Sequence, residues 1–224
     1  MNSHYLKLIV AFLAMLGLLS CKSADRTPAP AVSSNKKSFA THTLSDTELR
    51  RQIEASRLEK DKSLRQSKDS PLPAEARAAF KGLNYFPVDL GYRFKCELKL
   101  YNNNERVLML TSTGEQSEYI RYGYVEFNVA NVPCRLDIFK PTFLGPDSRH
   151  LFIPFRDATS SKETYGAGRY LEFEETGDSQ YILDFNLAYN PYCAYNKNYS
   201  CPIPPAQNTL KAEIRAGEKN YHSE

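Results

Sequence analysis

The sequence has no strong excess of charge of either sign. Its 29 basic and 26 acidic residues leave a formal net charge of only +3. Proteins that bind nucleic acid through its phosphates present a broad basic surface, which shows in the sequence as a basic surplus or as clusters of Lys and Arg. The near balance of charge therefore argues against a nucleic-acid partner.

Groups that carry out nucleophilic catalysis are also scarce. The chain has four histidines, of which only His150 falls among the predicted strands, and it has no Gly-x-Ser-x-Gly elbow. Nothing in the sequence indicates a cofactor. These absences favour a protein that is not an enzyme, and a hydrolase that works through paired carboxylates is the alternative.

A long apolar run is missing as well. The N-terminal stretch from Leu8 to Leu19 has no charged residue, but it is shorter than the roughly 20 apolar residues of a membrane-spanning helix. It follows Lys7, and a basic segment before a short apolar segment is the pattern of a secretion signal. We therefore interpret residues 1–20 as a signal peptide.

The end of this segment, Leu18-Leu19-Ser20-Cys21, resembles the lipobox of bacterial lipoproteins. The resemblance implies that Cys21 Sγ receives a diacylglyceryl group and that cleavage frees the Cys21 amine for a further acyl chain. Several acyl chains make a nearly irreversible membrane anchor. An ordinary signal peptide with an incidental cysteine is the alternative. Because Lys22 follows, and not the aspartate of inner-membrane retention, we expect a cell-envelope protein in the outer membrane.

Residues 22–42 are rich in Ser, Ala, Pro, Thr and Lys and nearly free of large apolar side chains. Such a segment cannot bury enough apolar surface to offset the entropy of an ordered chain. We interpret residues 21–42 as the lipidated cysteine and a flexible tether. Residues 43–224 are then a single domain, and their number suffices for one sizeable core.

The start of this domain has the pattern of an amphipathic helix. Ser45 and Glu48 form a capping box, and apolar residues recur at roughly helical spacing at Leu44, Leu49, Ile53, Leu58 and Leu64. We predict a helix over Asp46 to Gln66 that packs Leu49 and Ile53 against the domain. Pro71 and Pro73 end the segment, and Glu75 to Phe80 can add one short helical turn.

Downstream, β-branched and aromatic residues alternate with polar ones, which predicts strands. The turn residues between them include Asn102-Asn103-Asn104, Gly114, Asn131, Gly145-Pro146, Gly166 and Gly177-Asp178. Short strands at this spacing, without βαβ alternation, indicate a mainly β fold: an antiparallel β-sandwich or partly closed barrel. The predicted strands are Tyr92 to Tyr101, Arg106 to Ser112, Tyr119 to Val129, Pro133 to Phe139, Leu151 to Phe155, Arg169 to Glu174, Tyr181 to Asn186 and Leu210 to Ala216.

Four cysteines remain beside Cys21, and an oxidising compartment allows them to pair. Cys193 and Cys201 flank a loop rich in Tyr and Asn, so we predict a disulfide that closes this loop. A zinc site would need two more ligands nearby, and no histidine lies there; we expect no metal. Cys96 and Cys134 fall on predicted strands and are either inert buried thiols or a second bridge.

The order of motifs in the chain resembles that of the DUF1684 family, a domain of unknown function. The likeness extends over about Leu58 to Tyr221, and one departure is Ser161, where the family pattern has glycine. The resemblance implies no activity, because the family has none assigned. The motifs that carry it are Ser70-Pro71-Leu72, Gly82 to Pro87, Phe155 to Thr159, Thr164 to Leu171, Leu183 to Cys193, Cys201 to Asn208 and Ala216 to Lys219.

Within these motifs, acids, amides, an arginine and tyrosines gather in the C-terminal third. In a strand, Asp184 and Asn186 point to one face while Phe185 packs on the other. If that face lines a concavity, the side chains form a site for a polar small molecule, with Arg169 available for an anionic group. The candidate residues are Asp157, Thr159, Tyr165, Arg169, Asp184, Asn186, Tyr189 and Asn190, with Tyr192 beside them.

Three interpretations of this cluster follow. The first is a binding or scaffolding module for a polar envelope component or a partner protein. The second is a periplasmic hydrolase in which Asp157 and Asp184 act as general acid and base. The third is a purely structural corner, because Asp and Thr side chains at strand ends often bond to nearby backbone amides. We favour the first of the three for the domain as a whole.

Overall fold

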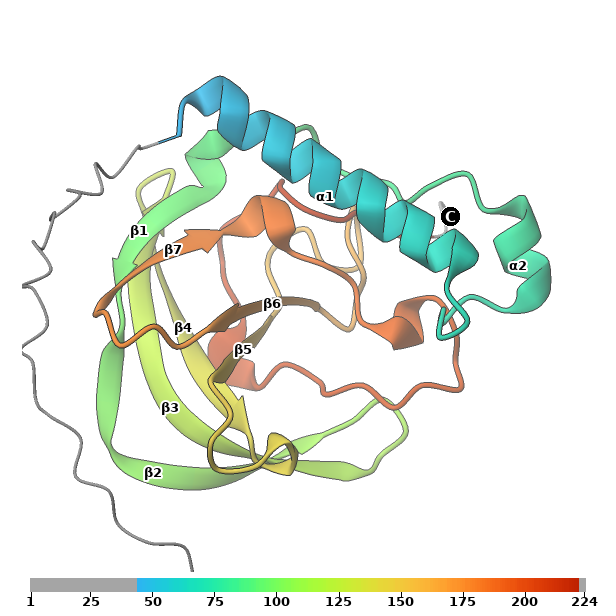
Figure 1. Ribbon diagram of the computed structural model, residues 1–224. Helices are drawn as coiled ribbons and strands as arrows, with labels where there is room; N and C mark the ends of the chain where they lie inside the picture. The colour runs from blue at the N-terminus through green and yellow to red at the C-terminus, as the bar shows by residue number, and fades with distance from the viewer. Residues whose placement is uncertain (1–43, 222–224) are drawn as a thin grey trace, which may run out of the picture. The chain divides into compact units, whose positions relative to one another are not determined.

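The fold is mainly β and its strands are antiparallel, as the sequence predicts. The computed structural model describes residues 44–221 (Figure 1), and within them neither sheet closes into a complete barrel. A two-stranded sheet pairs β1 (Arg93–Glu97) with β7 (Gln180–Asp184). The five-stranded sheet has the order β2 (Lys99–Leu110), β3 (Gln116–Val129), β4 (Val132–Pro141), β5 (His150–Phe155) and β6 (Arg169–Glu174).

The N-terminal helix α1 (Asp46–Gln66) has the predicted bounds. Ser45 accepts a hydrogen bond from the Glu48 amide at 3.2 Å, which satisfies one of the free donors of the first turn. Ile53 is buried, but Leu58 is 70% exposed. The predicted apolar face is wrong at Leu58, because five residues of helix place it about 140° around the axis from Ile53. A short helix, α2 (Ala74–Ala79), follows.

Polar side chains fasten α1 to the rest of the domain. Arg57 donates to Phe86 O at 2.8 Å and to Asn186 O at 3.3 Å, so the helix lies against the segment that follows β7. Asp61 accepts a hydrogen bond from the Leu83 amide at 3.1 Å. Much of the contact between α1 and the domain is therefore made by charged groups that a search for apolar spacing does not detect.

The predicted turn at Asn102-Asn103-Asn104 lies inside a strand. β2 runs without interruption through it, and its pairing with β3 shifts between Leu100 and Glu105. β2 is the edge strand of its sheet, where a bulge and exposed polar side chains are tolerated. The prediction of two strands at Tyr92 to Tyr101 and Arg106 to Ser112 is corrected accordingly: the break lies at Leu98, between β1 and β2.

The last predicted strand, Leu210 to Ala216, does not form: this segment has no strand assignment and belongs to neither sheet. Its alternate apolar residues are buried as expected, from Leu210 to Ile214. However, side chains satisfy part of its backbone: Asp157 accepts from the Ile214 amide at 2.7 Å, and Arg169 donates to Ile214 O at 2.8 Å. Backbone bonds add to these, from the Leu210 N–H to Arg156 O and from the Ala158 N–H to Ala212 O. The alternation therefore reflects burial, and side-chain and backbone bonds together hold the segment without a strand ladder.

The main core contains the remaining two cysteines. Cys96 and Cys134 are buried as free thiols beside Val125, Leu136 and Phe185. Burial raises the pKa of the Cys96 thiol to about 11, and this keeps it in the protonated, unreactive form. Of the two predicted alternatives, the structure shows inert buried thiols at these positions.

Candidate functional site

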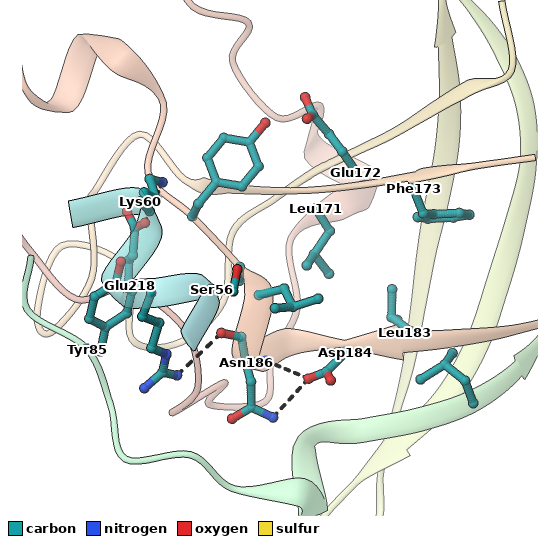
Figure 2. A pocket seen from close by; sticks show the side chains of 15 residues that line it. Ser56, Lys60, Tyr85, Leu171, Glu172, Phe173, Leu183, Asp184, Asn186 and Glu218 are labelled. Carbon is teal, nitrogen blue, oxygen red and sulfur yellow. Dashed lines mark hydrogen bonds and ion pairs between the residues drawn. The ribbon is translucent and has the colours of Figure 1, made fainter. Parts of the chain in front are cut away.

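Two adjoining cavities lie beside α1 and the C-terminal third of the chain. The first, which we call the polar cavity, has a volume of about 340 Å³ (Figure 2). The second, the aromatic cleft, has a volume of about 550 Å³. Lys60, Glu172 and Tyr189 line both cavities. The polar cavity is further lined by Ser56, Arg57, Tyr85, Asp184, Asn186 and Glu218.

Glu218 is the buried acid of the polar cavity, with only 1% of its surface exposed. Its carboxylate accepts hydrogen bonds from Lys60 Nζ at 2.5 Å, from the Asn190 amide at 2.8 Å and from Tyr195 Oη at 2.6 Å. Burial, with the charge of Glu218 added, raises the pKa of Tyr195. The phenol therefore stays protonated and donates to the carboxylate.

The backbone before Glu218 requires glycine. Gly217 has φ +78°, and a Cβ there would lie 2.5 Å from Ala188 O. A side chain would be strained by the backbone angle and would also strike the carbonyl oxygens of Phe185 and Ala188. The sequence Ala216-Gly217-Glu218 thus turns the chain so that the acid points inward, toward Lys60 (Figure 2).

Lys60 reaches this acid from the middle of α1. Its ammonium lies 4.7 Å from the centroid of the Tyr189 ring, so the cation contacts both a carboxylate and an aromatic face. Neither Lys60, Arg57 nor Glu218 was among the sequence candidates. The motif Ala216 to Lys219 contains the acid, but no sequence signal connects it to a lysine 158 residues away.

Asp184 and Asn186 meet at the edge of the polar cavity, as predicted, although not on one strand. β7 ends at Asp184, and Phe185–Leu187 forms a 3-10 helix whose first turn Asp184 caps. Asp184 Oδ1 accepts from the Asn186 amide at 3.0 Å, and Oδ2 accepts from Arg93 Nε at 2.8 Å. The strand prediction to Asn186 is corrected, because the capping side chain bends the backbone into a helical turn.

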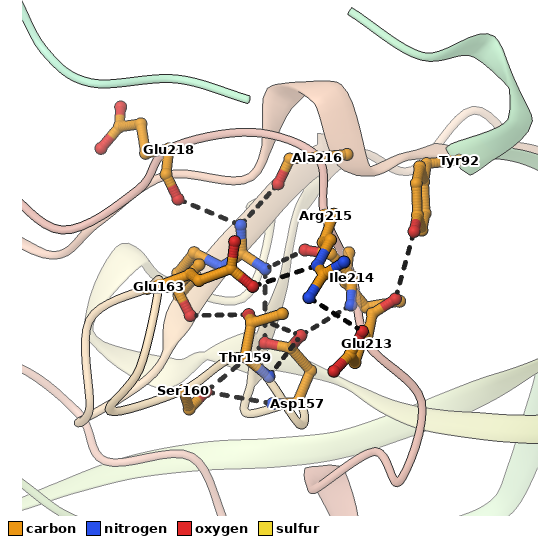
Figure 3. A network of polar contacts seen from close by, with 12 residues as sticks. Tyr92, Asp157, Thr159, Ser160, Glu163, Glu213, Ile214, Arg215, Ala216 and Glu218 are labelled. Atoms are coloured by element: carbon orange, nitrogen blue, oxygen red, sulfur yellow. Dashed lines mark hydrogen bonds and ion pairs between the residues drawn. The ribbon is translucent and has the colours of Figure 1, made fainter. Parts of the chain in front are cut away.

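Asp157 and Arg169 form a separate buried network (Figure 3). The Arg169 side chain is 1% exposed and donates to Asp157 Oδ1 at 3.3 Å and to the carbonyls of Ile214, Ala216 and Glu218. Asp157 Oδ2 accepts from Thr159 Oγ1 at 2.8 Å. None of these side chains lines either cavity. Their geometry matches the structural corner among the three interpretations.

The turn that follows this network explains the departure from the family pattern. Ser161 has φ +66°, a left-handed conformation that glycine adopts more readily than other residues. The chain therefore keeps at Ser161 the backbone shape that glycine would provide.

The other sequence candidates are distributed around the two cavities. Tyr189 lines both of them, and Tyr192 lines the aromatic cleft. Asn190 is buried and bonds Lys219 O through Nδ2 at 2.8 Å. Tyr165 donates to Cys193 Sγ at 3.7 Å. Of the eight principal candidates, the polar cavity gathers Asp184, Asn186 and Tyr189.

Cys193 and Cys201 lie together as free thiols in the structure. The Cys193 amide donates to Cys201 Sγ at 3.1 Å. A hydrogen bond from the Cys201 thiol lowers the pKa of Cys193 to about 6, with a smaller contribution from Tyr165. The thiolate is the form that attacks a disulfide or an electrophile, so the pair is arranged for oxidation. The disulfide itself stays a prediction.

We expect the two thiols to form a disulfide in an oxidising compartment. Mass mapping under non-reducing conditions should find a peptide that links Cys193 to Cys201. After reduction, iodoacetamide should modify Cys193 first, and its rate should rise through about pH 6 because the thiolate forms above the pKa. Buried Cys134 serves as the slow reference. Two freely alkylated thiols in protein isolated without reductant would contradict the prediction.

Two properties of the described residues bear on the kind of site. Among residues 44–221, no group of three or more His, Cys, Asp or Glu side chains is placed to hold a metal ion. In the same part of the chain, no helix is long and apolar enough to cross a membrane. The predicted signal peptide, Cys21 and the tether lie outside the described residues.

Comparisons with known proteins support the resemblance seen in the sequence. The profile of a family described as "Protein of unknown function (DUF1684)" matches residues 78–219. The fold is similar to the solution NMR structure of an uncharacterized protein of Haloarcula marismortui, with a TM-score of 0.61 and 34% sequence identity over 77% of this chain and 95% of that chain. No curated protein matches the chain. The family prediction is confirmed, and neither description assigns an activity.

Proposed function

The chain belongs to the DUF1684 family, and we propose that its domain is a binding module that holds a small molecule in the polar cavity and the aromatic cleft. The observation that carries this proposal is the wall of Lys60, Glu172 and Tyr189 that the two cavities share. A concave site with apolar walls and a few fixed polar groups is typical of ligand pockets. Such a wall allows one ligand to contact both cavities.

Exposed apolar side chains around the cavities support the same proposal. Phe143, Leu144 and Tyr192 border the aromatic cleft, and Ile182 and Leu187 border the polar cavity. Large apolar side chains that gather around a concavity mark a binding surface more often than scattered ones do. A partly apolar small molecule would cover them.

The paired-carboxylate hydrolase is not favoured by the geometry. A general acid or base must come within hydrogen-bond reach of the substrate. Asp157 has 1% of its side chain exposed and lines neither cavity. The Asp184 carboxylate is occupied by Arg93 and by the Asn186 amide. We therefore assign Asp157 a structural role and keep Asp184 as a wall residue.

Filling the polar cavity from α1 tests the binding proposal. Ser56 is exposed and lines the cavity, so Ser56→Trp places an indole in it without disturbing the core. The wild-type protein, incubated with a small-molecule extract of the cells that produce it, should retain specific compounds after gel filtration, as detected by mass spectrometry. Ser56→Trp should retain much less of them.

Ala55→Trp is the matched control. Ala55 is the exposed neighbour of Ser56 on α1 and does not line the cavity, so this variant should bind like the wild type. Equal retention by Ser56→Trp and the wild type would refute the site. A wild-type protein that retains nothing from the extract would refute the binding function.

We further propose that the domain acts at the envelope, anchored through Cys21. Cys21→Ser offers no thiol for the diacylglyceryl group, so radiolabelled palmitate should not be incorporated, and the protein should appear as an uncleaved precursor or a released soluble domain. Cys193→Ser is the control that should keep the label. Labelled palmitate in the Cys21→Ser protein would rule out this anchor.

A further inference from the structure

The walls of the aromatic cleft form a continuous aromatic surface. Tyr119 stacks on Phe152 with ring centroids 5.6 Å apart, and Phe152 meets the Tyr170 ring at 4.8 Å. Tyr170 in turn contacts the Tyr189 ring at 5.7 Å. The face of each ring carries partial negative charge and attracts cations. Lys60 gives an example of such a cation–ring contact at the wall that the two cavities share, where its ammonium lies over the Tyr189 ring.

The charges at the two cavities leave one carboxylate without a strong cationic partner. Glu218 pairs with Lys60 at 2.5 Å, and Asp184 pairs with Arg93 at 2.8 Å. Glu172 has 41% of its side chain exposed, and its basic neighbour is His150 Nε2 at 3.5 Å. Lys60 is neutralised by Glu218, and Arg57, the other cation of the polar cavity, donates to backbone carbonyls and does not line the aromatic cleft. The charge that a ligand in the cleft meets at the shared wall is therefore the negative charge of Glu172.

The cleft is also larger and more apolar than a simple ammonium requires. Its volume is about 550 Å³, and the exposed side chains of Phe143, Leu144 and Tyr192 border it. Apolar substituents on a cation would be removed from water against these side chains, which favours binding in proportion to the area buried. The shape and the charge therefore point to the same class of ligand.

We propose that the aromatic cleft binds an organic ammonium ion with apolar or aromatic substituents, with its charge beside Glu172 and its substituents against the aromatic walls. This inference rests on the proposed binding function and names the ligand class for it. An anionic ligand would meet the charge of Glu172 and the negative ring faces together, and both would repel it.

Four model compounds test the ligand class on the full-length chain in a non-ionic detergent. They are choline, its neutral isostere in which carbon replaces nitrogen, benzyltrimethylammonium and benzenesulfonate. Isothermal titrations at pH 8 should show saturable binding of both cations. Benzyltrimethylammonium should bind more tightly, because its ring adds apolar contact. The neutral isostere and the sulfonate should bind much more weakly.

Two matched variants test whether the carboxylate of Glu172 is the group that attracts the cation. Glu172→Gln should weaken binding of benzyltrimethylammonium at least about tenfold, which is about 1.4 kcal/mol. Glu174→Gln, two residues along β6 and outside both cavities, should bind like the wild type. The thermal unfolding midpoint of each variant checks that it is folded, and the comparison of cation with anion on the wild type does not depend on any variant.

Several outcomes would overturn the inference. They are equal binding of the sulfonate and the cation, unchanged affinity in Glu172→Gln, and no binding of either cation. If the wild type still retains compounds from the cell extract and Ser56→Trp does not, the proposed binding function stands and the ligand class alone is wrong. If the extract experiment fails as well, both proposals fail.

Discussion

Replacing Arg169 with methionine is expected to lower the free energy of unfolding by about 3–5 kcal/mol, the cost of removing one partner from a buried ion pair. Methionine keeps much of the volume but removes the donors to Ile214 O, Ala216 O and Glu218 O. It also leaves the buried Asp157 carboxylate without its cation. Urea unfolding followed by circular dichroism measures the loss.

Arg215→Met is the control for this change. Arg215 lies on the same C-terminal segment and pairs with Glu163 and Glu213, but its side chain is 53% exposed. Exposed ion pairs contribute between zero and about 1 kcal/mol, so this variant should remain close to the wild type. Adding Asp157→Asn to Arg169→Met should cost less than the sum of the single losses. Equal losses for Arg169→Met and Arg215→Met would contradict the structural role.

Local sequence signals predicted the parts of the fold that depend on neighbouring residues. Helix α1 was predicted with both of its bounds, because Ser45 and Glu48 form a cap at its start and Pro71 and Pro73 prevent it from continuing far beyond Gln66. The antiparallel β character follows from period-two patterns between turn residues. These signals operate over a few residues, and tertiary contacts did not override them.

Features that depend on distant residues were not predictable in the same way. The period-two pattern of Leu210 to Ala216 is real, but it reports burial beside Asp157 and Arg169 and not membership of a sheet. The sequence identified both side chains as polar candidates. It could not show that they bond to backbone groups about 45 to 57 residues away and so lie outside the cavities.

Only part of the candidate site was predicted, because only some of its residues lie close together in the sequence. Asp184, Asn186 and Tyr189 lie close together in sequence, and a short stretch of chain brings them to one wall. The groups that complete the wall come from α1 and from β6, at Lys60 and Glu172. From the sequence alone, Lys60 cannot be distinguished from an ordinary solvent-exposed lysine of a charged helix, because the acid that faces it is distant in the chain.

Lys60→Met is expected to destabilise the protein more than Glu218→Gln, although both variants break the same ion pair. Lys60→Met leaves a carboxylate with 2% of its side chain exposed and no cation, and an orphaned buried charge costs about 3–5 kcal/mol. Glu218→Gln leaves the charge on Lys60, which is 29% exposed and can turn to water. The new amide oxygen can still accept from the Asn190 amide and from Tyr195 Oη, so we expect a loss of about 1–3 kcal/mol.

Urea unfolding of four variants separates the effects. Lys62→Met is the control on the same helix, because Lys62 and its partner Glu59 are both exposed. The free energy of unfolding of this variant should differ from that of the wild type by less than about 0.5 kcal/mol. The double variant Lys60→Met with Glu218→Gln should be more stable than Lys60→Met alone, since removing the buried charge relieves the larger penalty. If Lys60→Met costs no more than Lys62→Met, the ion pair does not fasten α1 to the domain. Lys60 would then not be held by Glu218, and the argument that Glu172 lacks a strong cationic partner, which depends on that pairing, would fail as well.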